Sequence, residues 1–178
     1  MTIRFLAALS ACLFSMSLLA QEPSTGPIIE GYGRSVAVPD ADFKAPVDHD
    51  YRVVWEITEF PNGPGAVNRE LEFPARFLNL HAKAGVPLEK MHLAVVSHGA
   101  ALKNFVTDEV YEREFNMKNP NADLVRKLLA AGVQIYICGQ AMAFQGREKA
   151  QLAPGVKLAP SALTMMHLLQ DQGYTAQF

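Results

Sequence analysis

Short apolar runs alternate with helical patterns from residue 51 to the end of the chain. Residues 52–58, 91–97 and 133–138 are rich in β-branched and aromatic side chains, which predicts three strands. A short fourth strand is predicted at 156–158, and an edge strand at 174–178. Because these runs have few polar interruptions, we expect a mostly parallel sheet with both faces covered.

Helical spacing occupies the segments between the predicted strands. Pro74 is expected to kink the first of these helices or to mark its true start, and Gly85 to end it. Asn119-Pro120-Asn121 and Ser161 are predicted to cap two later helices. The predicted helices cover residues 71–85, 100–106, 122–131, 139–144 and 162–170. This alternation predicts an α/β fold, a flavodoxin-like three-layer sandwich around four or five strands.

The first fifty residues differ from the rest of the chain. Residues 1–20 have a basic start at Arg4, then an apolar run, and a polar segment follows from Gln21, as in a secretory signal peptide cleaved after Ala20. Residues 21–50 are rich in proline and glycine and are interpreted as an extended arm, and residues 51–178 as one domain. We therefore expect an exported, periplasmic protein, with lipid attachment at Cys12 or a retained anchor as the alternatives.

Composition narrows the classes of partner. Removing 20 of the 178 residues leaves 158, a length that suits a single domain, and changes the formal charge from −2 to −3. The remaining chain has no basic block, so nucleic acids and anionic membrane surfaces are poor partners. It also has no apolar run long enough for stable membrane insertion.

Two short motifs follow predicted strands, at the sheet edge where ligands gather in open α/β folds. They are Ser97-His98-Gly99 and Cys138-Gly139-Gln140. With Cys12 removed, Cys138 is the single cysteine, so no internal disulfide can form. A cysteine just before a helix meets unpaired amide hydrogens that favour a thiolate, and His98 is a candidate proton partner.

Each of these residues also has a simpler interpretation. Cys138 could be a small apolar side chain that closes a buried strand, and His98 could only hydrogen-bond a loop. The other histidines lack the spacing of metal ligands, so no metal site is predicted. The sequence has no phosphate-binding loop and no nucleophile elbow, and no cofactor is predicted.

Several motifs resemble those of the exported DsrE-like proteins, from about Gly26 to Phe178. The segments that carry the resemblance are Gly65-Ala66-Val67-Asn68-Arg69, Arg76-Phe77-Leu78-Asn79-Leu80-His81, Ser97-His98-Gly99-Ala100-Ala101-Leu102, Asn119-Pro120-Asn121, Ala131-Gly132-Val133-Gln134-Ile135-Tyr136-Ile137-Cys138-Gly139-Gln140 and Leu152-Ala153-Pro154-Gly155-Val156-Lys157.

This resemblance implies a DsrEFH fold that assembles as homotrimers or homohexamers. In sulfur-relay members a cysteine after a central strand carries sulfur as a persulfide, and Cys138 matches that position. The resulting hypothesis is a sulfur-carrier or sulfurtransferase-like protein, in which the Gly139 and Gln140 amides stabilise the sulfur and Gly99 lines the pocket. The alternative is a non-catalytic oligomeric module that binds a small ligand or a protein. The sequence leaves open whether the protein is an enzyme, and it does not identify the sulfur donor or acceptor.

Overall fold

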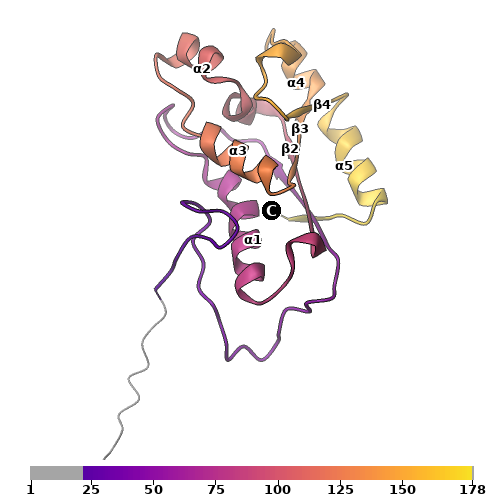
Figure 1. Cartoon of the computed structure of the whole chain (residues 1–178). Coiled ribbons are helices and arrows are strands. Elements are labelled where there is room, and N and C mark those ends of the chain that lie inside the picture. The colour runs from indigo at the N-terminus through magenta and orange to yellow at the C-terminus, as the bar shows by residue number, and fades with distance from the viewer. Residues whose placement is uncertain (1–21, 178) are drawn as a thin grey trace, which may run out of the picture.

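A computed structural model describes residues 22–177, and it contains one five-stranded sheet (Figure 1). The spatial order is β4-β3-β2-β1-β5, and every neighbouring pair is parallel. The strands are β1 (Tyr51–Ile57), β2 (Met91–Ser97), β3 (Gln134–Cys138), β4 (Lys157–Ala159) and β5 (Thr175–Gln177). The predicted flavodoxin-like α/β fold with a parallel sheet is therefore confirmed.

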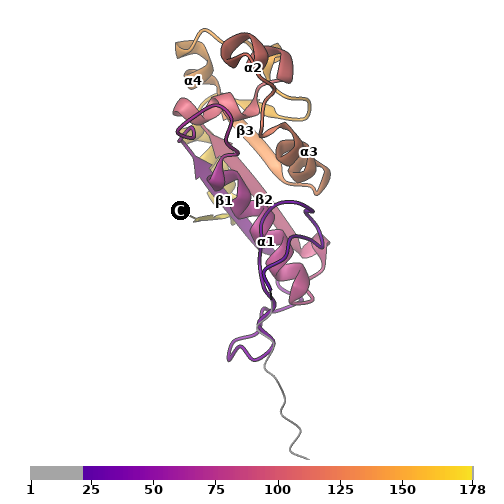
Figure 2. The ribbon, with the colours of Figure 1, turned by 90° about the vertical axis from the view of Figure 1, so that its left-hand side faces the viewer.

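Helices lie on both faces of the sheet and beyond its carboxyl edge (Figures 1 and 2). Because β1 to β4 advance in one direction, right-handed connections place their helices on one face, whereas the return to β5 places α5 on the other. The helices are α1 (Glu72–Lys83), α2 (Asp108–Phe115), α3 (Ala122–Ala130), α4 (Gly139–Phe144) and α5 (Ala162–Asp171), with short 3-10 helices η1 (Arg69–Leu71), η2 (Leu88–Lys90), η3 (Gly99–Phe105) and η4 (Lys149–Gln151).

The two faces of the sheet have hydrophobic cores of unequal size. The larger one packs α1 and α3 against the strands, and α4 contributes Met142 to it. The smaller one, called here the α5-side core, consists of Val54, Ala94, Val96, Cys138, Ala162, Leu169 and Tyr174. On this side Arg52 and Glu56 of β1 are exposed, so the expectation that both faces are covered is wrong for this strand. Among the helices of residues 22–177, α5 packs against the strands on that face, and Arg52 and Glu56 stay exposed beside it.

Several predicted elements differ in detail from the structure. The helix α2 was not predicted, although Thr107 caps it by accepting a hydrogen bond from the Val110 amide at 3.4 Å. The predicted helix at 100–106 is the 3-10 helix η3. Pro74 lies in the first turn of α1, where a missing amide hydrogen breaks no helical bond, and so α1 is not interrupted there.

The two predicted helix caps also have different outcomes. Ser161 caps α5 as expected, because its Oγ accepts a hydrogen bond from the Thr164 amide at 3.0 Å. In Asn119-Pro120-Asn121 the capping bond comes from Asn119, whose Oδ1 accepts from the backbone amide of Asn121 at 2.9 Å, whereas the Asn121 side chain makes no capping bond to α3. Both side chains are buried, and Asn121 Nδ2 also donates to Asn119 Oδ1 at 3.3 Å.

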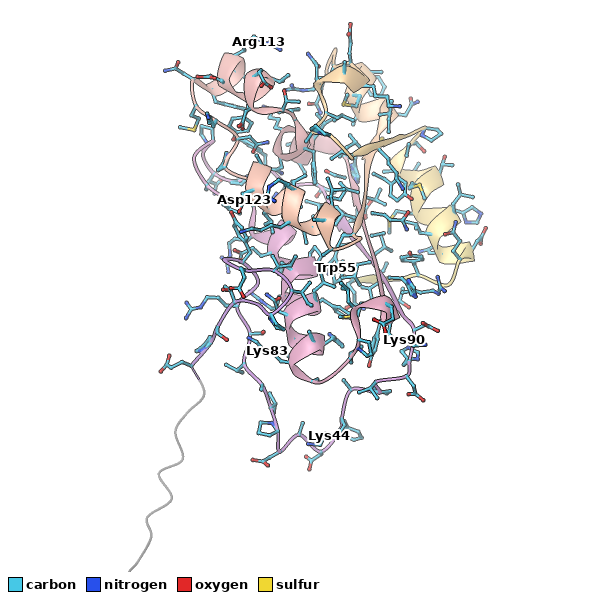
Figure 3. The ribbon with its side chains drawn as sticks, viewed as in Figure 1. Lys44, Trp55, Lys83, Lys90, Arg113 and Asp123 are labelled. Carbon is cyan, nitrogen blue, oxygen red and sulfur yellow. The ribbon has the colours of Figure 1, made fainter. Side chains whose placement is uncertain are left out.

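The segment before β1 forms no helix within residues 22–50 and lies partly over α1 and α3 (Figures 1 and 2). Asn79 of α1 is fully buried and pins it: its Oδ1 accepts from the Ile28 and Ile29 amides at 3.1 and 2.8 Å, and its Nδ2 donates to three carbonyls. Lys83, labelled in Figure 3, donates to the Ser24 and Ser35 carbonyls, each at 2.8 Å. Hydrogen bonds to α1, rather than a helix of its own, therefore hold the arm in place.

The predicted signal peptide at 1–20, including Cys12, lies outside the described residues. Within residues 22–177, no helix combines the length and apolar character needed to cross a membrane.

Candidate functional site

Cys138 is the last residue of β3 and directly precedes α4. It lies in the α5-side core, and only 6% of its surface is exposed. Within residues 22–177 its sulfur makes no capping hydrogen bond to α4. The thiol therefore lies at the predicted edge of the sheet, but apolar neighbours rather than hydrogen-bond donors surround it.

Gly139 allows the end of β4 to approach β3 closely. A Cβ atom at this position would lie 2.8 Å from the Ala159 carbonyl oxygen and 3.2 Å from that of Pro160. Gln140 supports the same contact, since its Nε2 donates to the Pro160 carbonyl at 3.4 Å. Both residues of the motif thus join β4 to the turn after β3, a role that sequence reasoning did not assign to them.

His98 follows β2, and its backbone is extended. Its amide donates to the Ile57 carbonyl at 3.2 Å, which continues the β1–β2 pairing by one residue. The imidazole Nε2 lies 2.9 Å from Oε1 of Glu56 on β1. Among the described residues no hydrogen bond joins His98 to Cys138. The imidazole therefore contacts β1 rather than β3.

Gly99 shapes the turn that follows His98. Its φ of +61° is in the left-handed region that favours glycine, and an added Cβ would lie 3.3 Å from the Thr58 carbonyl oxygen. The Gly99 carbonyl accepts a hydrogen bond from Nε2 of Gln145 at 2.8 Å. This bond ties the turn after β2 to the end of α4, so the turns after neighbouring strands are linked.

Glu56 is a site residue that sequence reasoning missed. A signal was available, because Arg52 and Glu56 lie four positions apart in β1 and therefore point to the same face of the sheet. Two charges on one face of a strand indicate that this part of the face is not buried. The partner of Glu56 could not be read from β1 alone, since the contact depends on the pairing of β1 with β2.

Buried asparagines hold the loops at the carboxyl edge. The backbone N–H of Asn68 donates to Oδ1 of Asn121 at 2.8 Å, and Asn121 Nδ2 donates to Oδ1 of Asn104 at 3.1 Å. Asn119 Nδ2 donates to the Asn104 and Val106 carbonyls at 3.0 and 2.9 Å. A buried, satisfied polar network of this kind fixes one arrangement of the loops. These asparagines therefore hold together the loops that follow β1, β2 and α2.

Glu114 of α2 links two segments near the same edge. It forms ion pairs with Lys103 of η3, at 3.3 Å, and with Arg147 after α4. Burial alone would raise the pKa of Glu114, but the hydrogen bond and charge of Arg147, together with Lys103, lower it below its ordinary value. One carboxylate is thus shared by two cations and joins η3 to the segment after α4, so we assign the cluster to loop positioning.

Two hollows of the surface lie away from the predicted site residues. Residues 22–177 contain no group of three or more His, Cys, Asp or Glu side chains arranged to hold a metal ion. A hollow of about 380 Å³ lies between the arm and α1, and one of about 390 Å³ lies between α3 and the start of α2. Neither is lined by the predicted site residues.

Comparison with known proteins identifies the family. A search of curated proteins finds no match to the chain. Among solved structures, a protein of unknown function from Methanobacterium thermoautotrophicum is similar, with a TM-score of 0.55 and 22% identity over 72% of this chain and 98% of the other. This likeness supports the fold alone. The model of the DsrE/DsrF-like family matches residues 68–178, which include His98 and Cys138. The chain belongs to the DsrE/DsrF-like family.

Proposed function

We propose that the protein is a sulfur carrier that accepts sulfur as a persulfide on Cys138. The observation that carries this proposal is the placement of Cys138, the one cysteine among residues 22–177, at the carboxyl end of β3 within the segment that matches the family. The family has members in sulfur relay. Parallel α/β sheets place their chemistry beyond this edge, which supports a role for a nucleophile there.

The proposed reaction needs a donor persulfide, R–S–SH, and no separate oxidant. The Cys138 thiolate attacks the outer sulfur of the donor, so a new sulfur–sulfur bond forms as the donor's own sulfur–sulfur bond breaks. The products are Cys138–S–SH and R–SH. The proton that leaves the Cys138 thiol is returned to the R–S⁻ leaving group.

His98 is the proposed carrier of that proton. Ser97 and Ile137 are partners in the β2–β3 register, so the next residues on these strands, His98 and Cys138, are neighbours. Adjacent strands lie about 5 Å apart, a separation that one bridging water or a small shift of the Cys138 side chain can span while the imidazole keeps its contact with Glu56. In the proposal His98 accepts the thiol proton and then donates it to the leaving thiolate.

The burial of Cys138 favours a second candidate, a non-catalytic oligomeric module that binds a small ligand or a protein. Ala162 and Leu169 of α5 pack in the same core as the thiol, and the 6% exposure of Cys138 suits a packing role as well. A sulfur carrier needs its thiol to be reachable from solvent in the folded state. The two candidates therefore differ in native thiol reactivity.

Alkylation of the folded protein separates these candidates. For a sulfur carrier, iodoacetamide labels Cys138 in native buffer at a rate within about tenfold of the rate in denaturant, since the folded thiol is reachable. A Cys138→Ser variant supplies the unlabelled control. Labelling that begins only after unfolding would favour the binding module and contradict the sulfur-carrier proposal.

We also propose that the protein assembles with itself, as a homotrimer or homohexamer. Large apolar side chains are exposed around β4 and α5, and these are Phe144 (89%), Leu158 (40%), Leu163 (84%) and Leu168 (45%). The helices α4 and α5 carry one formally charged residue, Asp171 at the end of α5, and depletion of charge is typical of the core of a subunit interface. Light scattering should give at least the mass of a dimer, and a monomer at micromolar concentration would contradict the proposal.

Export to the periplasm remains part of the proposal, on the basis of the sequence of residues 1–20. Sequencing of the mature amino terminus should start at or near Gln21. An intact Met1 or a lipid on Cys12 would contradict it.

A further inference from the structure

Three ionisable side chains form a row on one face of the sheet. The register pairs Glu56 with Val96, and His98, which directly follows β2, is two residues beyond Val96. Side chains two residues apart in a strand point to the same face, so Glu56, His98 and Cys138 share the α5-side face at the carboxyl edge. Their order follows that of strands β1, β2 and β3. A carboxylate, an imidazole and a thiol therefore succeed one another across neighbouring strands.

The imidazole is held from one side only. Its Nε2 lies 2.9 Å from Oε1 of Glu56, and Nδ1 has no hydrogen bond to any of the described residues. A carboxylate accepts hydrogen bonds but cannot donate them. In the neutral imidazole, therefore, Nε2 carries the hydrogen and Nδ1 keeps its lone pair. This is the tautomer that can accept a proton at Nδ1. The exposed fractions, 35% for the His98 side chain and 41% for that of Glu56, leave both side chains accessible to solvent.

We infer that Glu56 is a positioning residue for His98: it accepts the Nε2 hydrogen and keeps Nδ1 free to exchange a proton with Cys138. This inference rests on the proposed sulfur-carrier function and adds a residue to it. The logic is that of other nucleophile sites, in which a third group orients the base. Glu56 does not touch the reacting atoms, so its effect reaches Cys138 only through His98.

Two variants of Glu56 and one control separate positioning from general surface charge. Glu56→Ala removes the acceptor, whereas Glu56→Gln loses the charge but keeps an oxygen that can accept the Nε2 hydrogen. The control is Asp50→Asn. Asp50 Oδ1 lies 3.4 Å from Nε2 of His92, at the opposite end of β2, and so forms a similar pair far from Cys138 along the same strand.

The first measurement is nitrogen-edited NMR of the histidine rings, without any sulfur donor. In the wild-type protein and in Glu56→Gln we expect a hydrogen-bonded His98 Nε2–H signal and an unprotonated Nδ1. In Glu56→Ala that proton signal should be lost to exchange with solvent, whereas Asp50→Asn should leave it unchanged. A His98 signal that persists in Glu56→Ala would overturn the inference.

The second measurement is the rate at which glutathione persulfide adds sulfur to Cys138. Glu56→Ala should lower the rate about tenfold, and Glu56→Gln should recover most of it, because general acid–base catalysis depends on an oriented base. Equal rates in the wild type and Glu56→Ala would overturn the inference alone. A wild-type protein that takes up no sulfur would overturn the proposed function, and the inference with it.

Discussion

The two faces of the sheet are covered to different depths. On one face α1 and α3 pack over the strands, and the arm lies over part of these helices, held by Asn79 and Lys83. On the other face α5 is the helix that packs against the strands, and Arg52 and Glu56 remain exposed beside it. The difference is plain in Figure 1, where the arm lies on the side of the sheet away from α5.

The two faces therefore differ in their expected contributions to stability and to reactivity. The larger core, which buries most of the apolar side chains, lies under α1 and α3, so that face should supply most of the folding free energy. Cys138 and His98 belong to the face with the thinner cover. A single helix can shift at lower cost than a layer that is held on both sides, because fewer buried contacts are lost. We therefore expect changes near Cys138 to alter reactivity more than stability.

The largest expected effect compares a buried and an exposed side chain on opposite faces. Leu128 of α3 is fully buried, whereas Arg52 of β1 is exposed beside α5. Leu128→Ala should lower the free energy of unfolding by about 3 kcal/mol, since it leaves a cavity. Arg52→Ala should change it by less than about 1 kcal/mol. Urea denaturation of both variants measures the difference, and equal losses would break the comparison.

A smaller effect is expected where the arm is pinned. Asn79→Ala leaves the Ile28 and Ile29 amides without their acceptor, so the free energy of unfolding should fall by about 2 kcal/mol. Limited proteolysis should also cut the arm faster than in the wild type. Asn62→Ala, at an exposed loop position after β1, is the matched control and should change neither measurement. An arm that stays protected in Asn79→Ala would show that Asn79 does not hold it.

The smallest effect is a pH dependence of the stability, which we assign to His81 of α1, beside the arm. Burial lowers the pKa of His81 below its ordinary value of 6.5, although its Nδ1 bonds to the Phe77 carbonyl at 2.9 Å. The unfolded chain therefore takes up a proton near pH 6.5 that the folded protein binds only at lower pH. Stability should be unaffected by His81 above that pH and should fall as the pH drops through it.

Two histidine variants test the source of this pH dependence. His81→Gln should flatten the fall in stability between about pH 6.5 and pH 5, whatever its effect on stability at neutral pH. His167→Gln, at a side chain that is 73% exposed, should leave the slope unchanged. Urea midpoints measured across this pH range test both variants. If stability still fell with pH in His81→Gln as in the wild type, His81 would not be the source of the pH dependence.

The strands and most helices could be predicted because their signals are local. The runs that became β2 and β3 are apolar along their length, and Ser161 caps α5 through a bond to a residue three positions away. The helix α2 was missed because its apolar positions are few. Its local signals were Thr107 as the cap, acidic residues in the first turn, and Asn116 in the left-handed conformation that ends it.

The site could be predicted only in part, because its contacts cross the sheet. Cys138 and His98 were placed at the correct edge, since Cys138 ends β3, His98 directly follows β2, and parallel strands end together. The Glu56–His98 contact joins residues 42 positions apart in the sequence, and the close approach of β4 to Gly139 has no local signal either. Both depend on strand register, which a single sequence specifies weakly.

The central claim is that Cys138 accepts sulfur while the protein is folded. Its most direct test is the intact mass of the purified protein after incubation with glutathione persulfide in native buffer. The account predicts the addition of one sulfur atom, its removal by a thiol reductant, and no addition in Cys138→Ser. An unchanged mass in the native protein, with sulfur added only after denaturation, would contradict the claim and leave Cys138 as a packing residue under α5.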